Sequence, residues 1–482
     1  MLPLTVSIVL LQAVFGLAAM GKIVIPRLLD ERSKDGKHVV VIDDSMTLRL
    51  EKSSVLAERI VISGFDDVTT APQVIETRDL EKNLYHDPDH MASLMMSVGD
   101  QGLELDGMLN PTLKISPLAV TARRRMGSGV LHKVELIERA SVNYTHAFEP
   151  NATALTERVV TAKRQAGTLV TAVFPEVVVI SDRFHNTVYE WSKFIGYMII
   201  LFNAVNLRYQ SFTAPAVKFR VVGIHQMTLQ EDTFYMGLSL QNAEGGSTTK
   251  QFAKYAPGSI KYGSPDMFMI ITGRNLFVSS GGTLQDMAGL AYTGEICGVM
   301  NVGIVEDTAG TYKGVHVTAH EAAHLLGVVH DGMGPAANIP GHPGAQRLGC
   351  GWEDGYMMSY VDKGPRFSRF SPCAQDQIRV TLSFKTAVCI EEHFSVDYLT
   401  QLPGRLPGSA FDEKDYCRLM HPGIVGIFYL SPQKSEILVT CKIQCQTPLQ
   451  LNQLFYTYTH PAPDGLPRSD KATCLQGVCT RT

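Results

Sequence analysis

The chain has 482 residues, of which 45% are apolar and 19% charged, and its formal net charge is −4. This length predicts two to four domains. The near-neutral charge offers no electrostatic basis for binding nucleic acid or an anionic membrane surface, so neither partner is expected.

The first twenty residues form an uncharged apolar run that ends in small residues, MLPLTVSIVLLQAVFGLAAM. Such a run is typical of a secretory signal peptide and is short for a membrane-spanning helix, although a signal anchor is the alternative. The later apolar stretch from Ile195 to Val205 is shorter still and predicts a buried core helix. We therefore expect a secreted, extracellular protein whose mature form has no membrane span.

All nine cysteines lie at or beyond Cys297. In a secreted chain this clustering predicts disulfides confined to the C-terminal part. An odd count leaves at least one thiol free or paired between chains. We expect a monomer, and a dimer linked by an intermolecular disulfide is the alternative. The sequons at Asn143 and Asn151 are candidate N-glycosylation sites.

Residues 21–164 alternate β-type runs with charged turns, which predicts a strand-rich unit. The unit ends at a dibasic pair, Lys163-Arg164, directly before a new strand. Basic runs are usually solvated surface, but the position between two domain-like segments of a secreted chain favours a processing site. We expect a signal peptide over residues 1–20 and a propeptide over 21–164.

In residues 165–393 strands alternate with helices, and the continuous apolar runs of the strands predict an α/β sheet covered on both faces. A helix is expected from about Lys313 to Leu326, ended by Gly327, because glycine tolerates positive φ. The last segment, 394–482, carries five cysteines and little periodicity, which predicts a small disulfide-stapled module.

Three histidines and a glutamate stand within the segment HEAAHLLGVVHD, residues 320–331. His320 and His324 share one face of the expected helix, and a chain reversal after the helix can present His330 as a third ligand. Three neutral imidazoles suit Zn²⁺ and leave a fourth position for water, the pattern of a catalytic zinc site. Glu321 lies off the ligand row, so it can take a proton from zinc-bound water and deliver it to the leaving amine of a peptide.

Chance co-occurrence of these five fixed positions is expected roughly once in ten thousand such sequences. The remaining histidines are not predicted to be zinc ligands. His316, one turn before the first ligand, is expected beside the site or at the surface, and His342, His86 and His90 stand in loops that contain proline.

The pattern H-E-x-x-H-x-x-G-x-x-H with a downstream methionine turn resembles the metzincin signature. Asp331 directly follows the third histidine, and in this feature the chain resembles the reprolysin (adamalysin) branch of those zinc proteases. The resemblance is strongest to the secreted salivary metalloproteases of ticks and covers about residues 174–389, including FNAVNLRY, CGWEDGYMMS and RFSRFSPC.

The resemblance implies a metzincin catalytic domain with a mixed twisted sheet, an active-site helix and an irregular lower subdomain. Met358, with Met357 as the second candidate, would be the methionine beneath the zinc ligands. The stretch GLAYTGEICGVMNVGIVED would hold an edge strand that binds extended substrate by strand addition.

The resemblance also implies two disulfides, Cys297 with Cys389 and Cys350 with Cys373. Some relatives bind a structural Ca²⁺ opposite the cleft, and the corresponding positions here carry three carboxylates, although scattered carboxylates are more often solvated surface; they are Glu176, Asp266 and Glu392.

The chain departs from the family pattern in two places. No cysteine precedes Cys297, so a propeptide thiolate on the zinc is excluded, and latency must come from occlusion or from another ligand such as a carboxylate. The tail resembles disintegrin-like and cysteine-rich modules, but Leu466-Pro467-Arg468 replaces an expected cysteine. The lost partner would explain an orphan among Cys417, Cys441, Cys445, Cys474 and Cys479.

Two classes of function remain. The first is a secreted zinc endopeptidase acting on host extracellular proteins such as fibrinogen or matrix proteins. The second is an inactive binding protein that engages a host partner through its cysteine-rich tail; a structural zinc protein is a distant third, because its site would be closed by four protein ligands. The complete set of motif residues favours the enzyme.

Overall fold

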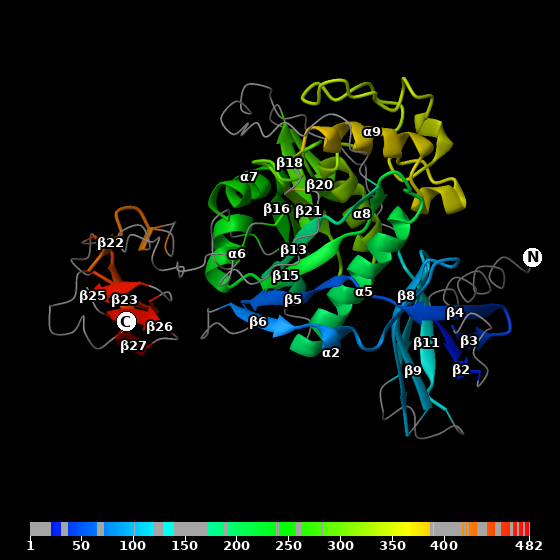
Figure 1. The fold of residues 1–482 in the computed structure, drawn as a ribbon, viewed down its shortest axis with the longest axis horizontal. Helices are drawn as coiled ribbons and strands as arrows, with labels where there is room; N and C mark the ends of the chain where they lie inside the picture. The colour runs from blue at the N-terminus through cyan, green and yellow to red at the C-terminus, as the bar shows by residue number, and fades with distance from the viewer. Residues whose placement is uncertain are drawn as a thin grey trace, which may run out of the picture. The chain divides into compact units, whose positions relative to one another are not determined.

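The structure is a computed structural model (Figure 1). It describes residues 21–29, 37–64, 72–100, 102–118, 129–138, 171–186, 190–237, 239, 241–256, 262–263, 265–280, 283–385 and 389, and, nearer the C-terminus, residues 417–418, 421, 424–430, 441–448, 455–462, 466–469, 472–475 and 478–481. The predicted signal peptide, the dibasic pair Lys163-Arg164, the sequons at Asn143 and Asn151, and Glu392 lie outside the described residues. The chain divides into two compact units, 1–254 with 264–394 and 255–263 with 395–482.

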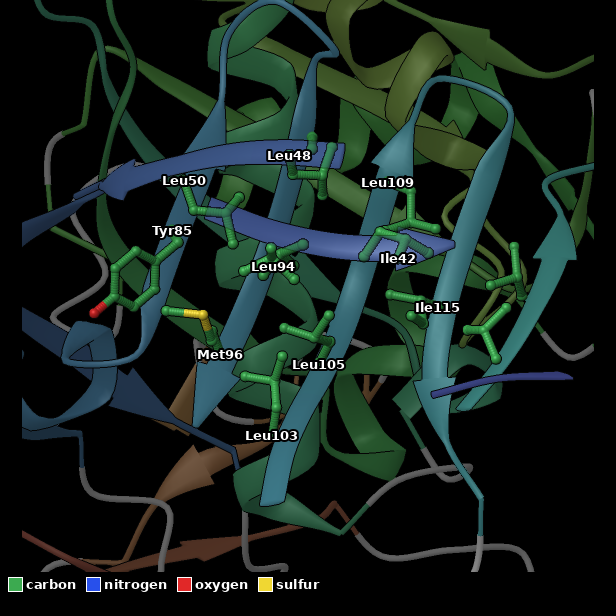
Figure 2. Close-up of a cluster of buried hydrophobic side chains, with 14 residues drawn as sticks. Ile42, Leu48, Leu50, Tyr85, Leu94, Met96, Leu103, Leu105, Leu109 and Ile115 are labelled. Carbon is green, nitrogen blue, oxygen red and sulfur yellow. The ribbon is translucent and has the colours of Figure 1, made fainter. Parts of the chain in front are cut away.

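The first unit begins with a strand-rich region, as the sequence predicts. Its nine strands pair in the order β1 (Lys22–Val24), β11 (His132–Leu136), β10 (Leu113–Pro117), β9 (Gly102–Asn110), β8 (Ala92–Gly99), β7 (Leu84–Asp87), β4 (Met46–Lys52), β3 (His38–Asp43) and β2 (Arg27–Leu28). Figure 2 shows β3 and β4 crossing the face of β8, β9 and β10. The apolar side chains between these layers, among them Leu48, Leu50, Leu94 and Leu105, are fully buried, so the sheet encloses its own core.

A second, seven-stranded sheet carries the α/β region. Its order is β20 (Gly289–Leu290), β21 (Val302–Glu306), β17 (Met267–Thr272), β13 (Glu176–Ser181), β15 (Arg220–Gln226), β5 (Leu56–Ser63) and β6 (Gln73–Glu76). The five central strands are parallel, and the two edge strands, β20 and β6, are antiparallel to their neighbours. Every residue of β17 is buried, as expected for a strand covered on both faces. The predicted α/β class is thereby confirmed.

Helices accompany this sheet in chain order: α2 (Arg78–Glu81), α4 (Arg183–Asn186), α5 (Trp191–Tyr209), α6 (Leu229–Met236), α7 (Gly245–Tyr255), α8 (Gly314–Leu325) and α9 (Pro372–Ser383). The predicted core helix from Ile195 to Val205 lies within α5. Helix α8 packs on β20, β21 and β17, and α5 packs on α8. Short elements complete the unit: β12 (Ala172–Val173) with β14 (Ala216–Val217), the sheet of β16 (Asn242–Glu244), β18 (Asn275–Ser280) and β19 (Thr283–Met287), and the 3-10 turns η2 (Trp352–Asp354) and η3 (Gly364–Ser368).

Two strands of the predicted propeptide lie in this α/β sheet. Figure 1 shows β5 and β6 continuing the sheet beyond β15. Strand β5 runs parallel to β15, its residue Ile60 is 0% exposed, and Ser63 Oγ lies 2.7 Å from His225 Nδ1 of β15. The sequence places both strands in a separate N-terminal unit, because a short β-type run predicts a strand without revealing which sheet that strand joins.

Helix α5 joins the two sheets further. Ser93 of β8 donates a hydrogen bond from Oγ to the carbonyl of Ile200 (2.9 Å), and it accepts one from Asn203 Nδ2 (3.0 Å). Ser53 Oγ donates to Asn203 Oδ1 (2.6 Å). Because these groups are largely buried, the N-terminal region and the α/β region fold as one unit.

The second unit is a small module with two three-stranded antiparallel sheets. These are β22 (Phe428–Tyr429), β23 (Lys442–Gln446) and β24 (Thr457–Pro461), and β25 (Pro467–Ser469), β26 (Ala472–Leu475) and β27 (Val478–Arg481). A disulfide joins Cys417 to Cys445, both fully buried beside Ile443, and Cys441 is also disulfide-bonded. The prediction of a disulfide-stapled module is confirmed.

Among the residues that the structure describes, no helix is long and apolar enough to cross a membrane.

Candidate metal centre and active site

The helix that carries the motif ends where the sequence predicts. Helix α8 has Lys313 and Leu326 as its flanking cap residues, and Gly327 follows with φ of 95°. A Cβ at Gly327 would lie 1.9 Å from Thr381 Oγ1 on α9. Only glycine satisfies both the backbone angle and this close approach, and the reversal that it permits turns the chain back toward His330.

The reversal brings the three motif histidines to one point. The Nε2 atoms of His320 and His330 lie 3.1 Å apart, those of His324 and His320 3.1 Å, and those of His324 and His330 3.2 Å. All three side chains are buried, and among the described residues these three nitrogens form a candidate metal-binding group.

Backbone carbonyls fix the ring orientation of two of these histidines. His320 Nδ1 lies 2.9 Å from the carbonyl oxygen of Met357, and His324 Nδ1 lies 2.7 Å from that of Val328. A carbonyl only accepts, so each Nδ1 carries the proton and each Nε2 directs its lone pair into the group. Burial lowers the pKa of His320 to about 4 and that of His324 to about 3, which keeps both rings neutral. Converging lone pairs on neutral imidazoles are the donor set that Zn²⁺ prefers, so these residues fit the metal.

Glu321 lies beside the three histidines, and its side chain is closely packed. Its side chain is 3% exposed, and burial raises the pKa of its carboxyl well above the usual range. Strand β20 passes directly over it, and a Cβ at Gly289 would lie 2.7 Å from both Glu321 Oε1 and Val317 Cγ1. The absence of a side chain at Gly289 therefore lets the edge strand approach the carboxyl.

The chain at Met357 and Met358 contacts the segment that carries the third histidine. Met357 and Met358 are both fully buried, and the carbonyl of Met358 accepts a hydrogen bond from the backbone N–H of Asp331 (2.9 Å). Asp331 Oδ1 accepts a second bond from Ser371 Oγ (2.7 Å), and burial raises the pKa of this carboxyl to about 6. Asp331 thus connects the loop of His330 to Met358 and to the start of α9.

The other histidines lie outside the metal group. His316 stacks on Phe367, with ring centroids 4.2 Å apart. His342 is buried in the loop after α8, where its Nε2 lies 2.7 Å from the carbonyl oxygen of Gly327 and its Nδ1 accepts from the N–H of Ala336. His86 contacts Glu51. His90 contacts Asp87.

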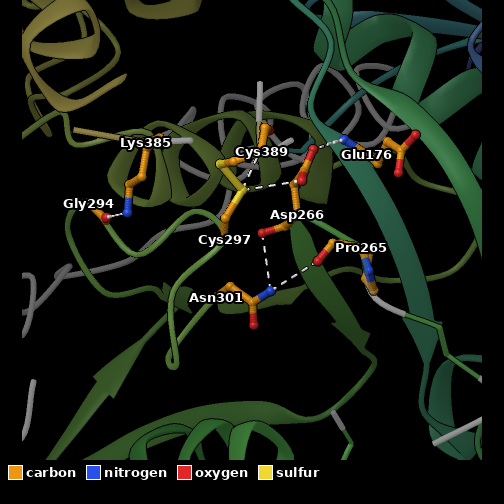
Figure 3. The surroundings of a disulfide bond; sticks show 8 residues. All are labelled: Glu176, Pro265, Asp266, Gly294, Cys297, Asn301, Lys385 and Cys389. Carbon is orange, nitrogen blue, oxygen red and sulfur yellow. Dashed lines mark hydrogen bonds between the residues drawn. A yellow bond between two sulfur atoms is a disulfide. The ribbon is translucent and has the colours of Figure 1, made fainter. Parts of the chain in front are cut away.

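Two disulfides brace the region around the site. The structure joins Cys297 to Cys389 and Cys350 to Cys373, the pairs that the family resemblance implies. Figure 3 shows Asp266 against the first bridge, and its Oδ2 accepts a hydrogen bond from the backbone N–H of Glu176 (2.9 Å).

Two of the three predicted calcium ligands are thus neighbours, Glu176 and Asp266, whereas Glu392 lies outside the described residues. Burial, followed by the nearby charge of Glu176, raises the pKa of Asp266 to about 8, although the backbone hydrogen bond opposes the shift.

Several site residues have no signal in the motif. Gln377 Oε1 accepts the backbone N–H of Val329 (3.0 Å) and so helps to hold the segment that carries His330. Tyr360 Oη lies 2.9 Å from His330 Nε2. Nothing in one sequence distinguishes this residue from the 16 other tyrosines or Gly289 from the 40 other glycines, since only the folded chain brings them to the site.

In this mixed α/β domain, one helix and the chain reversal after it bring three histidines together beside a buried glutamate. This arrangement defines a metallopeptidase-type centre. Residues 174–371 match the sequence model of metallo-peptidase family M12, named Reprolysin_5. This segment is a reprolysin-type M12 metalloendopeptidase domain, with His320, His324 and His330 as its zinc-binding triad.

Alignments with individual proteins extend the likeness beyond that segment. The chain is 28% identical over 324 residues to a protein from Bombyx mori named "A disintegrin and metalloproteinase with thrombospondin motifs like", covering 64% of this chain and 44% of that protein. It is 24% identical to the venom metalloproteinase antarease of Tityus serrulatus (75% of this chain, 91% of that one) and 25% identical to a venom metalloproteinase of Olivierus martensii (70% and 83%). The chain therefore spans less than half of the first relative. These relatives do not single out the salivary proteins of ticks.

Replacing Gly289 by alanine should lower kcat/KM by about tenfold or more, because the new methyl group would displace the Glu321 carboxyl. Zinc content should stay at the wild-type value. Gly196→Ala, at a helical position with no atom within 4 Å of the added Cβ, is the matched control and should leave activity unchanged. Wild-type kinetics in Gly289→Ala would show that the carboxyl does not depend on this contact.

Proposed function

We propose that the protein is a secreted zinc endopeptidase that hydrolyses peptide bonds of extracellular proteins. The observation that carries the proposal is the convergence of the three Nε2 atoms, 3.1–3.2 Å apart, beside the buried carboxyl of Glu321. Zinc in this place would polarise the scissile carbonyl and acidify a water molecule.

The chain's own residues would supply the proton transfers and the positioning. Glu321, buried beside the three histidines, would accept the proton of the attacking water and return it to the leaving amine. The carbonyls of Met357 and Val328 keep the Nε2 lone pairs of His320 and His324 aimed at the metal. Met358 is assigned as the methionine beneath the ligands.

Substrate would bind along β20, within the stretch that resembles the reprolysin edge strand. This strand ends the sheet order on the side of α8, and its residue Gly289 lies over Glu321. An extended peptide added beside β20 would place its backbone next to the catalytic carboxyl, so main-chain hydrogen bonds would provide affinity that does not depend on sequence.

The domain organisation proposed is a signal peptide over 1–20, a propeptide over 21–164, a catalytic domain over 165–393 and a cysteine-rich module over 394–482, with cleavage after Arg164. Because β5 pairs with β15 and buries Ile60, the N-terminal segment contributes to the fold of the catalytic sheet. After a cut at Lys163-Arg164 it would remain bound until that pairing opens.

The proposed substrates are host fibrinogen or matrix proteins, with a role in saliva against clotting. Two kinds of support exist: the signal-like N-terminus and relatives that are named as venom metalloproteinases. N-glycosylation at Asn143 and Asn151 is proposed as well, because a secreted protein passes through the compartment in which such sites are modified.

A structural Ca²⁺ at Asp266 and Glu176 is proposed as a second ion. Asp266 has a folded pKa near 8 and an unfolded value near 3.8, so between these pH values the folded state holds a proton that the unfolded state has lost. Stability without calcium should therefore fall as pH rises from about 4 to about 8, and a bound cation should remove that penalty.

In a chelator that spares zinc, the wild-type melting temperature should fall between pH 5 and pH 8, and millimolar calcium should restore it at pH 7.5. Asp266→Asn should lack the pH dependence and the calcium response, because the amide does not ionise. Asp286→Asn, at an exposed position of β19, is the control. An equal calcium response in wild type and Asp266→Asn would place the ion elsewhere.

The function is tested by incubating the purified, processed protein with gelatin and with fibrinogen and reading cleavage by electrophoresis and N-terminal peptide profiling. Cleavage that a zinc chelator abolishes supports the proposal. A protein that binds one zinc yet cleaves neither these substrates nor a random peptide library would instead support the inactive binding protein.

A further inference from the structure

The C-terminal module holds a pair of histidines whose ring nitrogens face each other. His421 Nε2 lies 2.7 Å from His460 Nε2, and the two ring centroids are 4.9 Å apart. The residues come from different places in the module, since His421 precedes β22 and His460 lies in β24. His421 is 5% exposed and His460 is half-buried, so solvent reaches the pair from the side of His460.

Neighbouring groups hold both rings in place. The ring of His421 packs on that of Tyr458, with centroids 4.3 Å apart, and its backbone N–H donates to the carbonyl of Cys417 (3.1 Å). The pairing of β24 with β23 fixes the backbone of His460. The disulfide between Cys417 and Cys445 ties the segment before His421 to β23. The two imidazoles are therefore positioned by the fold of the module.

Two facing Nε2 atoms can share either a proton or a metal ion. In the first case one Nε2 carries a proton and donates it to the other. In the second case both lone pairs bind the cation and each ring carries its proton on Nδ1, so no proton has to leave the pair. Burial, followed by the charge of His460, lowers the pKa of His421 to about 4, so this ring is neutral at pH 7 and able to bind a metal.

The spacing of the two nitrogens suits a metal after a small adjustment. Nitrogens 2.7 Å apart, each about 2.0–2.1 Å from a zinc ion, would subtend about 80° at the metal. The separation of 3.1 Å between the Nε2 atoms of His320 and His324 in the catalytic triad corresponds to about 100°. A slight rotation of the half-buried His460 ring would provide the difference.

We propose that His421 and His460 form a second metal site, which binds Zn²⁺ or another late first-row divalent cation through their Nε2 atoms. Imidazole nitrogen suits these ions. Cys445 Sγ belongs to the same group of donor atoms, which lie within 4.8 Å of one another, but its sulfur is held in the disulfide and offers no thiolate.

Water would complete the coordination at this second site. With two protein ligands it should release zinc on dialysis, whereas the catalytic triad, with three, should retain its own. The inference goes beyond the proposed peptidase and does not depend on it.

Zinc titration of the full chain tests the second site. Wild-type protein stripped of metal should bind zinc in two steps, the second weaker than the first. His460→Phe replaces one ligand by another aromatic ring and should lose the second step while keeping the first. His324→Ala should lose the first step and keep the second. His90→Phe, which changes an exposed histidine that contacts Asp87 in the first unit, is the matched control and should show both steps.

A measurement on the wild-type chain decides the case in which His460→Phe does not fold. Protein carrying its catalytic zinc is treated with diethyl pyrocarbonate, with and without excess zinc, and the modified histidines are identified by peptide mass spectrometry. Excess zinc should protect His460 and leave the modification of His90 unchanged.

Three results would overturn the second site. They are a second step in wild type that does not protect His460, a second step of equal strength in His460→Phe, and the absence of any second step up to millimolar zinc. The last result would leave a histidine pair that shares a proton. Loss of the first step in wild type, with the second retained, would instead count against the zinc peptidase alone.

Discussion

Replacing Glu321 by glutamine should lower kcat/KM for peptide-bond hydrolysis by about a thousandfold or more. Glutamine has nearly the same shape and fits the buried space beneath Gly289, but it cannot take a proton from the attacking water. The three histidines are untouched, so the variant should still bind one zinc per chain. Steady-state kinetics on a fluorogenic peptide and metal analysis of the same sample measure both quantities.

The control for this substitution is Glu353→Gln, which removes an exposed carboxylate from η2 after the metal-binding loop. It should retain wild-type activity. Substantial hydrolysis by Glu321→Gln at wild-type zinc content would mean that another group acts as the base, and the proton-transfer role assigned to Glu321 would be wrong.

Ile60→Asp should cost about 4 kcal/mol or more of stability, although residue 60 belongs to the predicted propeptide. Ile60 is fully buried in β5, where the strand pairs with β15, so the substitution places a charge inside the α/β core. We expect little or no folded protein on secretion and, in any recovered sample, a melting temperature lower by more than ten degrees.

Val74→Asp makes the matched change on the neighbouring strand β6, where the side chain is 46% exposed, and should shift the melting temperature only slightly. Equal effects of the two substitutions would mean that β5 does not complete the catalytic sheet. A stable, active Ile60→Asp protein would lead to the same conclusion.

The metal ligands are the part that one sequence predicts best. Residues 320–331 combine a helical spacing with a glycine stop, and both follow from local geometry, so α8 and the reversal at Gly327 agree with expectation. The disulfides Cys297–Cys389 and Cys350–Cys373 were implied by resemblance, and the structure contains both.

The remainder depends on contacts between distant segments. The apolar run of β5 predicts a strand but not the sheet that it joins, and its pairing with β15 is set by the surface that both strands bury. Gly289 matters because β20 crosses Glu321, and Tyr360 because its loop passes His330. Such close approaches between distant segments arise only after folding, so the spacing of residues along the chain does not predict them.

Removing the metal and adding it back tests whether this centre is a zinc peptidase. The processed protein is stripped with a chelator, dialysed, and titrated with zinc while cleavage of a protein substrate is followed. Activity should disappear on stripping and return in full at one equivalent of zinc, with no return in His324→Ala. Undiminished cleavage by the stripped wild-type protein would contradict the claim that this site is a zinc peptidase.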